Sequence, residues 1–566
     1  MVSQYFLILF LFICQSFNLL IRRLTEIKRL VLEIGPSAYI KTRTKIIAAE
    51  IKRKWIGFMG MSVLEDYERL LLKYRDLAVL ASAKGVLQWD TETMMPPGAF
   101  DLRGQQLALL SKIEHSMITD REIGELLDKI EKSQGYESLD QVQKRNVYLI
   151  RKQYDENTRL PEELVTETER QAIACYKQWR DAKTAKDFKI FEPELNKMFE
   201  LKKQAAEILS EVKGVKTLYD ALVDFFEPKV SEEAIRNTFD QLKSRLIPII
   251  SKYSSSQPNA DWLKRPVPQN MQVEIAKKVA EFINYDISGN SARGRIDPTE
   301  HPFTIGYYDD VRITTHYYED NFMSSLFSVL HEGGHALYEL NLDPSWKYQP
   351  VGTACSFGFH ESQSRFVENV VGRSKYFWTY FLPIINKLTS GQFSDIDMAE
   401  ALRAVNSVKP SKIRIEADEA TYALHIITRF EIESALFSGK VDVKDLPQVW
   451  NEKYSKYLGV EIQNDAEGVL QDVHWAHGYF GYFPSYALGN IYCAQILNKL
   501  EKEVEDCWTE IEKGNFEPTR QWLTKNIHRA GNLYDPMELL VKVTGESINP
   551  NHFADYLEGK YRTIYG

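Results

Sequence analysis

Apolar residues recur at helical spacing along most of this chain. From Leu64 to about Ile250 they return every three or four positions, charged residues fill the opposite faces, and β-branched runs are few. Helical spacing resumes at Asn321 and continues to the C-terminus, with breaks at glycine and proline. This pattern predicts an all-α, mainly helical protein.

The stretch from Gly289 to Tyr318 departs from the helical pattern. It contains glycine, proline and several aromatic residues, and its polar and apolar residues alternate over Val311–Thr314. Alternation with a period of two is typical of β-strands, so we expect a small antiparallel sheet here, beside the helix that follows. An edge strand of such a sheet could bind an extended peptide by strand addition.

The helix expected at Asn321–Leu340, NFMSSLFSVLHEGGHALYEL, carries a candidate metal site. His331 and His335 are four residues apart, so both imidazoles leave the same helix face about one turn from each other. That spacing places two nitrogens where one Zn²⁺ can be bound. Glu332 lies one residue round, near the metal without being a ligand. The HEGGH sequence is the H-E-x-x-H pattern of zinc hydrolases.

The same pattern has an interpretation without a metal, in which two hydrogen-bonded histidines lie on a buried helix. A chain of this length would contain the pattern by accident about one time in a hundred. Gly333 and Gly334 argue against that interpretation, because each costs roughly 1 kcal/mol relative to alanine in mid-helix. A helix that lets a substrate or another backbone approach the metal has a reason to carry them.

A catalytic zinc needs a third protein ligand and an open position for water. A histidine six residues beyond His335 would indicate a metzincin, but that position is Asn341. The next option is a carboxylate on a following helix, which Glu361 supplies. Glu339 is nearer in sequence, but the helix would have to bend back on its own ligands. We therefore predict Glu361 as the third ligand, and we expect His360 to contact a ligand or the substrate.

Composition narrows the class of protein. Of 566 residues, 44% are apolar and 26% are charged, as in soluble globular proteins, and the length is enough for two or more lobes. The net charge of -9 gives no general attraction to nucleic acid or to an anionic membrane. The five cysteines are scattered and form no C-x-x-C pair, so we expect a reducing compartment, the cytoplasm.

The first sixty residues do not match the rest. Residues 5–14, YFLILFLFIC, are continuously apolar, and a segment rich in Lys and Arg follows as far as Lys54. The apolar run suits a signal-peptide core and is short for a membrane span, yet no basic residue precedes it. Three interpretations stay open: an upstream start codon ahead of Met61, an uncleaved membrane anchor over residues 5–21, or a signal peptide. We divide the chain into this extension, 1–60, and a helical domain, 61–566.

Several longer motifs occur in one order around the HEGGH sequence. They are Trp89-Asp90, Met95-Pro96-Pro97-Gly98-Ala99, His301-Pro302-Phe303, Asp310-x-Arg312-x-Thr314, His360-Glu361-Ser362-Gln363, Ile413-Arg414-x-x-Ala417-Asp418-Glu419-x-x-Tyr422 and Gly468-x-x-Gln471-Asp472-x-His474-Trp475. With these motifs the chain resembles the carboxypeptidase Taq family of zinc metallocarboxypeptidases from about Met61 to the C-terminus. Gly333 stands where we expect a larger residue in many relatives.

The resemblance implies an all-helical, saddle-like, two-lobed fold with a deep groove, a small sheet along it, and His301 facing the substrate. It also implies a homodimer with one Zn²⁺ per subunit, or Co²⁺ as an alternative, that removes single C-terminal residues from peptides with broad side-chain tolerance. An oligopeptidase or dipeptidyl carboxypeptidase of similar fold is one alternative function. A catalytically silent peptide-binding protein is another, but the intact metal and base residues argue against it.

Roles follow for the remaining polar residues of the motifs. Glu332 is the expected general base, and Tyr422 and His474 are expected to donate hydrogen bonds to the oxyanion of the reaction. A planar guanidinium recognises a free α-carboxylate by paired hydrogen bonds, so Arg312 and Arg414 are the expected substrate anchors. The alternative for each of these tyrosine, histidine and arginine side chains is an ordinary structural hydrogen bond or ion pair.

Overall fold

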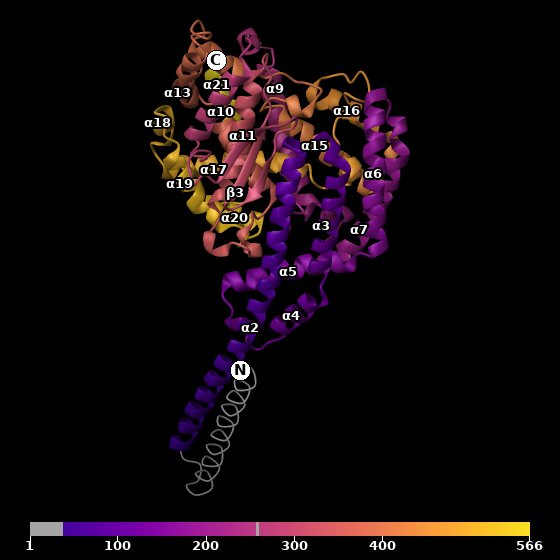
Figure 1. Ribbon diagram of the computed structural model, residues 1–566, viewed down its shortest axis with the longest axis vertical. Coiled ribbons are helices and arrows are strands. Elements are labelled where there is room, and N and C mark those ends of the chain that lie inside the picture. The colour runs from indigo at the N-terminus through magenta and orange to yellow at the C-terminus, as the bar shows by residue number, and fades with distance from the viewer. Residues whose placement is uncertain (1–37, 256–257, 259) are drawn as a thin grey trace. The chain divides into compact units, whose positions relative to one another are not determined.

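The computed structural model describes residues 38–566 except 256, 257 and 259, and it describes side chains from Val63 onward (Figure 1). Contacts divide the chain into two compact units. The first comprises the residues up to Leu70 together with Glu125–Lys144. The second comprises Leu71–Gly124 and Arg145–Gly566, and it contains every candidate site residue.

The predicted N-terminal extension is only partly covered. The apolar run at residues 5–21 lies outside the described residues. The division predicted after residue 60 falls inside one continuous helix, α2 (Ala38–Thr93), and it remains a prediction. Among the residues that the structure describes, no helix is both long enough and apolar enough to cross a membrane.

Helices dominate the described chain and confirm the predicted all-α class. After α2, the helices of the N-terminal half are α3 (Phe100–Ile118), α4 (Arg121–Glu131), α5 (Gln141–Arg159), α6 (Glu162–Ala185), α7 (Glu192–Lys213), α8 (Leu218–Val223), α9 (Glu232–Tyr253) and α10 (Gln269–Phe282). Those of the C-terminal half are α11 (Phe322–Asn341), α12 (Phe357–Arg365), α13 (Lys375–Leu388), α14 (Met398–Val405), α15 (Tyr422–Phe437), α16 (Leu446–Leu458), α17 (Pro484–Glu503), α18 (Cys507–Glu512), α19 (Glu517–Asn526), α20 (Pro536–Thr544) and α21 (Asn551–Tyr565).

The described residues contain one small sheet, in the segment where alternation predicts strands. Its strands are β1 (Gly294–Pro298), β2 (Thr304–Tyr307) and β3 (Asp310–Thr315). Their order is β1-β3-β2; β2 pairs with β3 antiparallel, whereas β1 pairs with β3 parallel. The antiparallel sheet that we predicted is therefore wrong for one of its two pairings. Alternation reveals strands but not their partners, and here the link between β1 and β2 carries the chain from one edge of the sheet to the other.

Helix α11 packs against β3 (Figure 1), and it also packs against α12. Its two glycines allow this close packing. A Cβ on Gly334 would lie 2.5 Å from the carbonyl oxygen of Gln363 and 2.6 Å from Cα of Ser364, both in α12. A Cβ on Gly333 would lie 2.3 Å from Cδ1 of Ile283. Gly334 therefore allows the backbone of α12 to lie close to α11, as predicted, and Gly333 leaves space for the side chain of Ile283.

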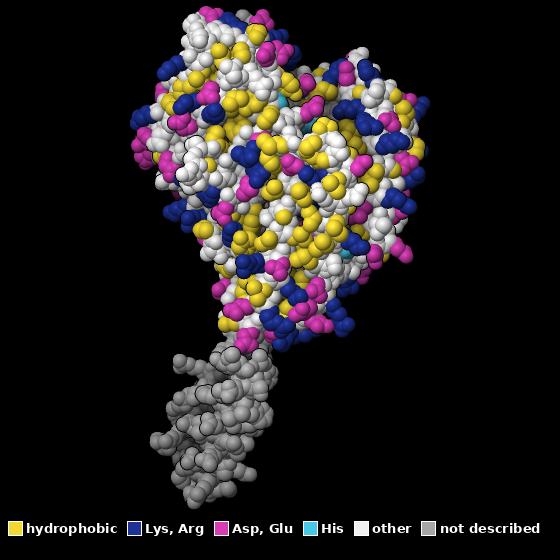
Figure 2. Space-filling model, viewed as in Figure 1, with side chains coloured by type: hydrophobic (Ala, Val, Ile, Leu, Met, Phe, Trp, Pro, Cys, Tyr) yellow, Lys and Arg dark blue, Asp and Glu magenta, His cyan; other side chains and the backbone are white. Residues whose placement is uncertain are grey.

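Helices α2 and α3 expose a stripe of apolar side chains to solvent. On α2, Leu72, Val79 and Val86 follow one another at intervals of seven residues, and they are 59%, 46% and 38% exposed. On α3, Leu102 and Leu109 have the same spacing, and both are 59% exposed. Residues seven apart share one helix face. Figure 2 shows hydrophobic side chains gathered over these two helices, and we call these five residues the apolar stripe.

Candidate metal centre

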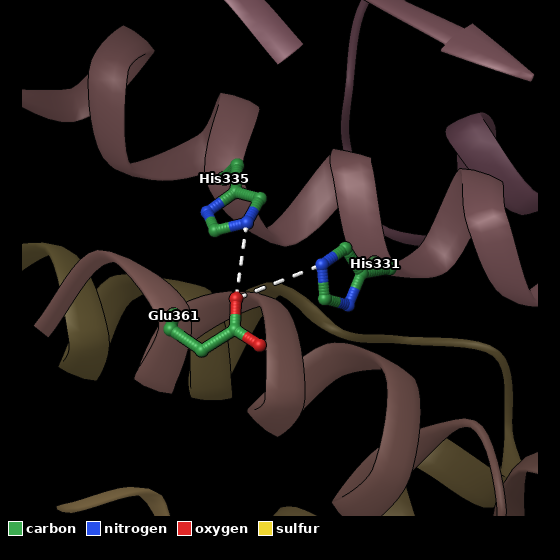
Figure 3. A group of neighbouring side chains, drawn as sticks. All are labelled: His331, His335 and Glu361. Carbon is green, nitrogen blue, oxygen red and sulfur yellow. Dashed lines mark ion pairs between the residues drawn. The ribbon is translucent and has the colours of Figure 1, made fainter. Parts of the chain in front are cut away.

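Three side chains from two helices converge on one point (Figure 3). His331 and His335 project from the same face of α11, and Glu361 projects from α12. The Oε2 atom of Glu361 lies 3.4 Å from Nε2 of His335 and 3.7 Å from Nε2 of His331. One ligand atom from each residue falls within 4.8 Å of the other two. The structure thus brings together the three residues predicted as metal ligands.

The spacing of these atoms fits a metal ion. Two ligand atoms that each lie 2.0–2.1 Å from a tetrahedral zinc are about 3.3 Å apart, close to the observed separations. In both histidines the other ring nitrogen, Nδ1, already has a partner: Glu368 Oε2 at 2.8 Å from His331, and His360 Nδ1 at 2.5 Å from His335. The two Nε2 atoms are therefore the ones left to bind a metal. Such partners fix the orientation of ligand histidines in many metal sites.

Glu361 is held by neighbours on its own helix. Nε of Arg365 donates to its Oε1 atom at 2.7 Å, and Oγ of Ser364 donates to Oε2 at 3.0 Å. Arg365 also donates to Glu368 at 3.2 Å, so it joins the partner of His331 to the third ligand. Neither Arg365 nor Glu368 was predicted from the sequence. The spacing of four residues between Glu361 and Arg365 is a signal that could have found Arg365, whereas Glu368 contacts His331 of another helix.

Glu368 lies in a π-helical segment, Phe366–Val371, that continues α12. π-helical turns are rare and occur frequently at functional sites. Here the segment carries a buried carboxylate to the ring of His331. Burial would raise the pKa of Glu368, but Arg365 and His331 lower it to about 2, so this carboxylate is ionised at neutral pH.

His360 lies between a ligand and a second carboxylate. Its Nδ1 atom meets Nδ1 of His335, and its Nε2 atom lies 2.8 Å from Oε1 of Glu339. Glu339, which we rejected as a ligand, thus contacts His360. His360 also lines the cavity in front of these residues, and its contact with the substrate stays a prediction.

Burial and the neighbouring charges shift the pKa values of the histidines and of Glu361 in opposite directions. Burial lowers the pKa of His331, but Glu361 and Glu368 outweigh burial and raise it to about 9. Burial, together with the neighbouring His360 and His331, lowers the pKa of His335 to about 3, although Glu361 acts in the opposite direction. Burial would raise the pKa of Glu361, yet Arg365 and His331 hold it well below the usual range. The cluster therefore keeps an ionised carboxylate and one neutral imidazole ready for a cation.

Glu332 lies beside the metal ligands and is held by the sheet. Oγ1 of Thr304, in β2, donates to its Oε2 atom at 2.6 Å and to its backbone oxygen at 2.9 Å. Glu332 is only 7% exposed, and burial raises the pKa of its carboxyl group, while His331 and Thr304 act in the opposite direction. A buried carboxyl with a raised pKa is suited to accept and return a proton. Thr304 was not predicted.

A cavity of about 700 Å³ opens in front of these groups. Apart from the metal-site residues, its lining carries no charged side chain among the described residues; it consists of Phe225, Phe226, Pro228, Pro302, Phe303, Thr304, Ala354, Cys355, Ser356, Phe357, Tyr482, Ser485, Tyr486 and Asn532. His301 is exposed and does not line this cavity, although Pro302 and Phe303 of the same motif do.

The last two motifs meet in a cluster of polar side chains. Arg414 donates from Nε and Nη2 to Oδ1 of Asp472 at 3.0 and 2.8 Å, and from Nη1 to the hydroxyl of Tyr422 at 3.1 Å. The guanidinium carbon of Arg414 lies 5.2 Å from the ring centre of Tyr486, which lines the cavity. Nδ1 of His474 lies 4.0 Å from Asp472. Three predicted residues, Arg414, Tyr422 and His474, are therefore neighbours.

Arg312 lies elsewhere. Its guanidinium donates to Asp310 in the same strand at 2.7 Å, and its central carbon lies 4.2 Å from the ring centre of Trp89. It lines a separate cavity of about 230 Å³ beside Gly85 and Tyr348. The described structure does not bring Arg312 to the metal centre, even though its motif precedes the metal helix directly in sequence.

Comparison with known proteins agrees with this geometry. A sequence model of the carboxypeptidase Taq (M32) metallopeptidases matches residues 69–561. Carboxypeptidase 1 of Bacillus subtilis is 39% identical over 491 residues, which cover 86% of this chain and 96% of that protein. Thermostable carboxypeptidase 1 of Thermus thermophilus is 39% identical over 509 residues, 88% of this chain and 99% of that protein. The chain belongs to the carboxypeptidase Taq family.

Solved structures give the same result. The M32 carboxypeptidase from Deinococcus radiodurans superimposes with a TM-score of 0.85 at 34% sequence identity. The superposition covers 89% of this chain and 100% of the Deinococcus chain. Metallocarboxypeptidase 1 of Trypanosoma cruzi superimposes with a TM-score of 0.84 at 33% sequence identity. That superposition covers 88% of this chain and 99% of the Trypanosoma chain. This member of the carboxypeptidase Taq family is thus a metallocarboxypeptidase, a peptide hydrolase, and the resemblance and function predicted from the motifs are confirmed.

Proposed function

We propose that this metallocarboxypeptidase holds one Zn²⁺ on His331, His335 and Glu361 and releases single C-terminal amino acids. The observation that carries the proposal is the convergence of two Nε2 atoms and one carboxylate oxygen, with both Nδ1 atoms already bonded. When bound, zinc lowers the pKa of a water molecule to about 7 and polarises the scissile carbonyl. Co²⁺ suits the same donor set as an alternative ion.

Glu332 moves the protons. In the proposed mechanism its carboxylate takes a proton from the attacking water and returns it to the leaving amine. The hydroxyl of Thr304 holds one carboxylate oxygen, which leaves the other to face the cavity. Because β2 is an edge strand beside this cavity, an extended peptide can add to it as a further strand, which would lay the scissile bond along the metal helix.

Arg414, Tyr422 and His474 are the proposed contacts to the substrate end and the oxyanion. Asp472 fixes two nitrogens of Arg414, and a fixed guanidinium is suited to pair with a free α-carboxylate. Burial lowers the pKa of His474 to about 4, although Asp472 opposes this shift, so its imidazole is neutral near pH 7 and can donate one N–H. Of the two predicted anchors we retain Arg414, because Arg312 lines a separate cavity, whereas Arg414 lies beside Tyr486 of the main cavity.

The lining of the cavity supports broad side-chain tolerance. Aromatic and small polar groups surround the space, and the charged groups among its described lining residues belong to the metal site. Apolar contacts discriminate weakly between side chains, because one methylene is worth only about 1–3 kcal/mol. We therefore expect neutral C-terminal residues of different sizes all to be released, at rates that differ by about 10–200-fold for one methylene.

The products of a short peptide test this function. An N-acetylated hexapeptide with a free C-terminus should give a ladder of products, each shorter by one residue at the C-terminus, when the masses are followed over time. The C-terminally amidated peptide is the matched control and should stay intact, because it lacks the carboxylate. A chelator should stop the reaction. Release of dipeptides or internal fragments would instead favour the oligopeptidase or dipeptidyl carboxypeptidase.

We propose that the apolar stripe of α2 and α3 joins two copies of the chain into a homodimer. Exposed leucine and valine side chains at seven-residue spacing on two helices are a surface that a second helical pair can cover. Sedimentation equilibrium should give twice the subunit mass of 65.6 kDa. A Val79→Glu, Leu109→Glu double variant should shift it to one subunit. A monomeric wild-type protein would contradict this proposal.

We also propose that the protein acts in the cytoplasm. Cys175, Cys355, Cys493 and Cys507 are free and buried, which suits a reducing compartment. Cell fractionation with detection of the native chain should find it with the soluble fraction. Recovery with membranes would instead support the anchor at residues 5–21.

A further inference from the structure

Glu227 is a buried carboxylate that the proposed mechanism does not use. It is 0% exposed and follows α8, in a segment whose residues Phe225, Phe226 and Pro228 line the substrate cavity. Its neighbours in sequence thus face the cavity, while its own side chain lies in the interior. Within the described part of the chain no Lys, Arg or His forms an ion pair with it.

Four donors surround the Glu227 carboxylate. The backbone N–H of Gly358 and the hydroxyl of Ser485 donate to Oε1, the latter at 2.8 Å, and the hydroxyl of Tyr492 donates to Oε2 at 3.3 Å. The hydroxyl of Ser356 is also bonded to it. Burial raises the pKa of Glu227 to about 7, although these donors favour the ionised form. Hydrogen bonds thus replace the water lost on burial.

Three of the four donors come from the first turns of two helices, and Tyr492 lies further along α17. Ser356 is the N-cap of α12 and Gly358 its second residue, and Ser485 is the second residue of α17. The first N–H groups of a helix have no partner within it, and the helix dipole makes this end positive. The carboxylate of Glu227 satisfies one of these N–H groups and lies near the positive ends of both helices.

The helix that contacts Glu227 also carries Glu361, the proposed third metal ligand. The backbone N–H of Phe357 donates to the carbonyl oxygen of Phe226 at 3.0 Å, so the cavity wall and α12 are joined twice. A Cβ on Gly358 would lie 2.7 Å from Oε1 of Glu227, and a Cβ on Gly489 of α17 would lie 2.7 Å from Cγ of Glu361. Glu361 follows Gly358 by one helical turn. No side chain could be added at either glycine without moving the carboxylates.

We propose that Glu227 is a positioning residue that holds the first turn of α12, and through it the Glu361 carboxylate, in fixed register with α17 and the wall of the substrate cavity. The proposal rests on the function proposed above, because it assumes that Glu361 binds a metal. Glu227 touches neither substrate nor metal. It acts through the helix that carries the ligand, from a position 134 residues earlier in the chain.

Metal affinity tests this role directly. A Glu227→Gln variant keeps the shape of the side chain, but its amide group donates where Glu227 accepts. We expect its Zn²⁺ affinity, measured by competition with a chromogenic chelator, to fall about 10–100-fold, as for other groups that orient ligands. A Ser485→Ala variant, which removes one donor, should weaken binding less in the same direction. Replacing Zn²⁺ by Co²⁺ should reveal an altered absorption spectrum in Glu227→Gln.

Glu433 offers a matched control. It is also 0% exposed, and it accepts from Tyr219 and Trp475 at 2.7 Å and from the N–H of Gly481 at 3.0 Å. Burial raises its pKa to about 7 as well. A Glu433→Gln variant should lower thermal stability without changing metal affinity, because none of these partners lies in α12.

Two results would overturn the proposal. One is a folded Glu227→Gln protein that binds Zn²⁺ as tightly as the wild type, and the other is an equal loss of metal affinity in Glu433→Gln. If Glu227→Gln does not fold, unchanged metal affinity and an unchanged Co²⁺ spectrum in Ser485→Ala would overturn it. Failure of the wild-type protein to bind Zn²⁺ would instead reject the proposed function. The two failures are therefore distinguishable.

Discussion

A Glu332→Gln variant is expected to lose about 10²–10⁴-fold in kcat while it binds metal as the wild type does. The amide keeps the size of the side chain and can still accept from Thr304, but it cannot take a proton from water. Because Glu332 is not among the metal ligands, the metal content should not change. Peptide hydrolysis and metal analysis on the same sample measure both quantities.

Thr304 provides the control for Glu332. A Thr304→Val variant keeps the carboxylate but removes its hydrogen bond of 2.6 Å, so kcat should fall by a smaller factor, and Thr304→Ser should restore it. Persistent hydrolysis by metal-bound Glu332→Gln would reject Glu332 as the general base. Equal losses in Thr304→Val and Thr304→Ser would reject the role of the hydroxyl.

A Glu361→Gln variant is expected to bind Zn²⁺ more than about 100-fold less tightly and to lose activity with the metal. The carboxylate is the only anionic member of the three-residue set, and its Oε2 atom faces both histidines. Removing groups that merely orient ligands costs about 10–100-fold in affinity, so loss of a ligand should exceed that range. Calorimetric titration of the metal-free variant with Zn²⁺ measures the change.

A variant of Glu368 separates loss of a metal ligand from loss of a group that orients a ligand. A Glu368→Gln variant loses the anionic partner of His331 but keeps all three ligand atoms, so its affinity should fall between those of the wild type and Glu361→Gln. Full metal content in Glu361→Gln would reject that residue as a ligand. A greater loss in Glu368→Gln than in Glu361→Gln would show that the ligand set had been assigned wrongly.

The sheet shows where sequence patterns stop being informative. Alternation over Val311–Thr314 located β3, because the side-chain period belongs to each strand alone. It could not say that β1 would pair with β3 in parallel, because pairing depends on where the connecting chain runs. The sequence likewise could not say which groups would lie beside Arg312 and Arg414. Both stand in recognisable motifs, but only the folded chain separates one from the metal centre and brings the other beside its cavity.

The groups around the ligands were hardest to predict, because their partners lie in other elements. Thr304 reaches Glu332 from a strand 28 residues earlier, and Glu227 reaches α12 from 131 residues earlier. Neither residue type nor local spacing distinguishes them from other threonines and glutamates. Arg365 is the exception, since it lies one turn from Glu361 on the same helix.

By itself the sequence determined the helical class and the pairing of the two histidines, because both follow from the repeat of a single helix: His331 and His335 share a face wherever α11 lies. The role of Glu332 as general base stays a prediction. Rejection of nearer candidates led to Glu361 as the predicted third ligand, and the ordered motifs indicated the family. The tertiary structure alone decided which polar groups complete the site, because hydrogen bonds such as His331–Glu368 and Thr304–Glu332 form between elements, at distances of 2.8 and 2.6 Å that only their packing sets.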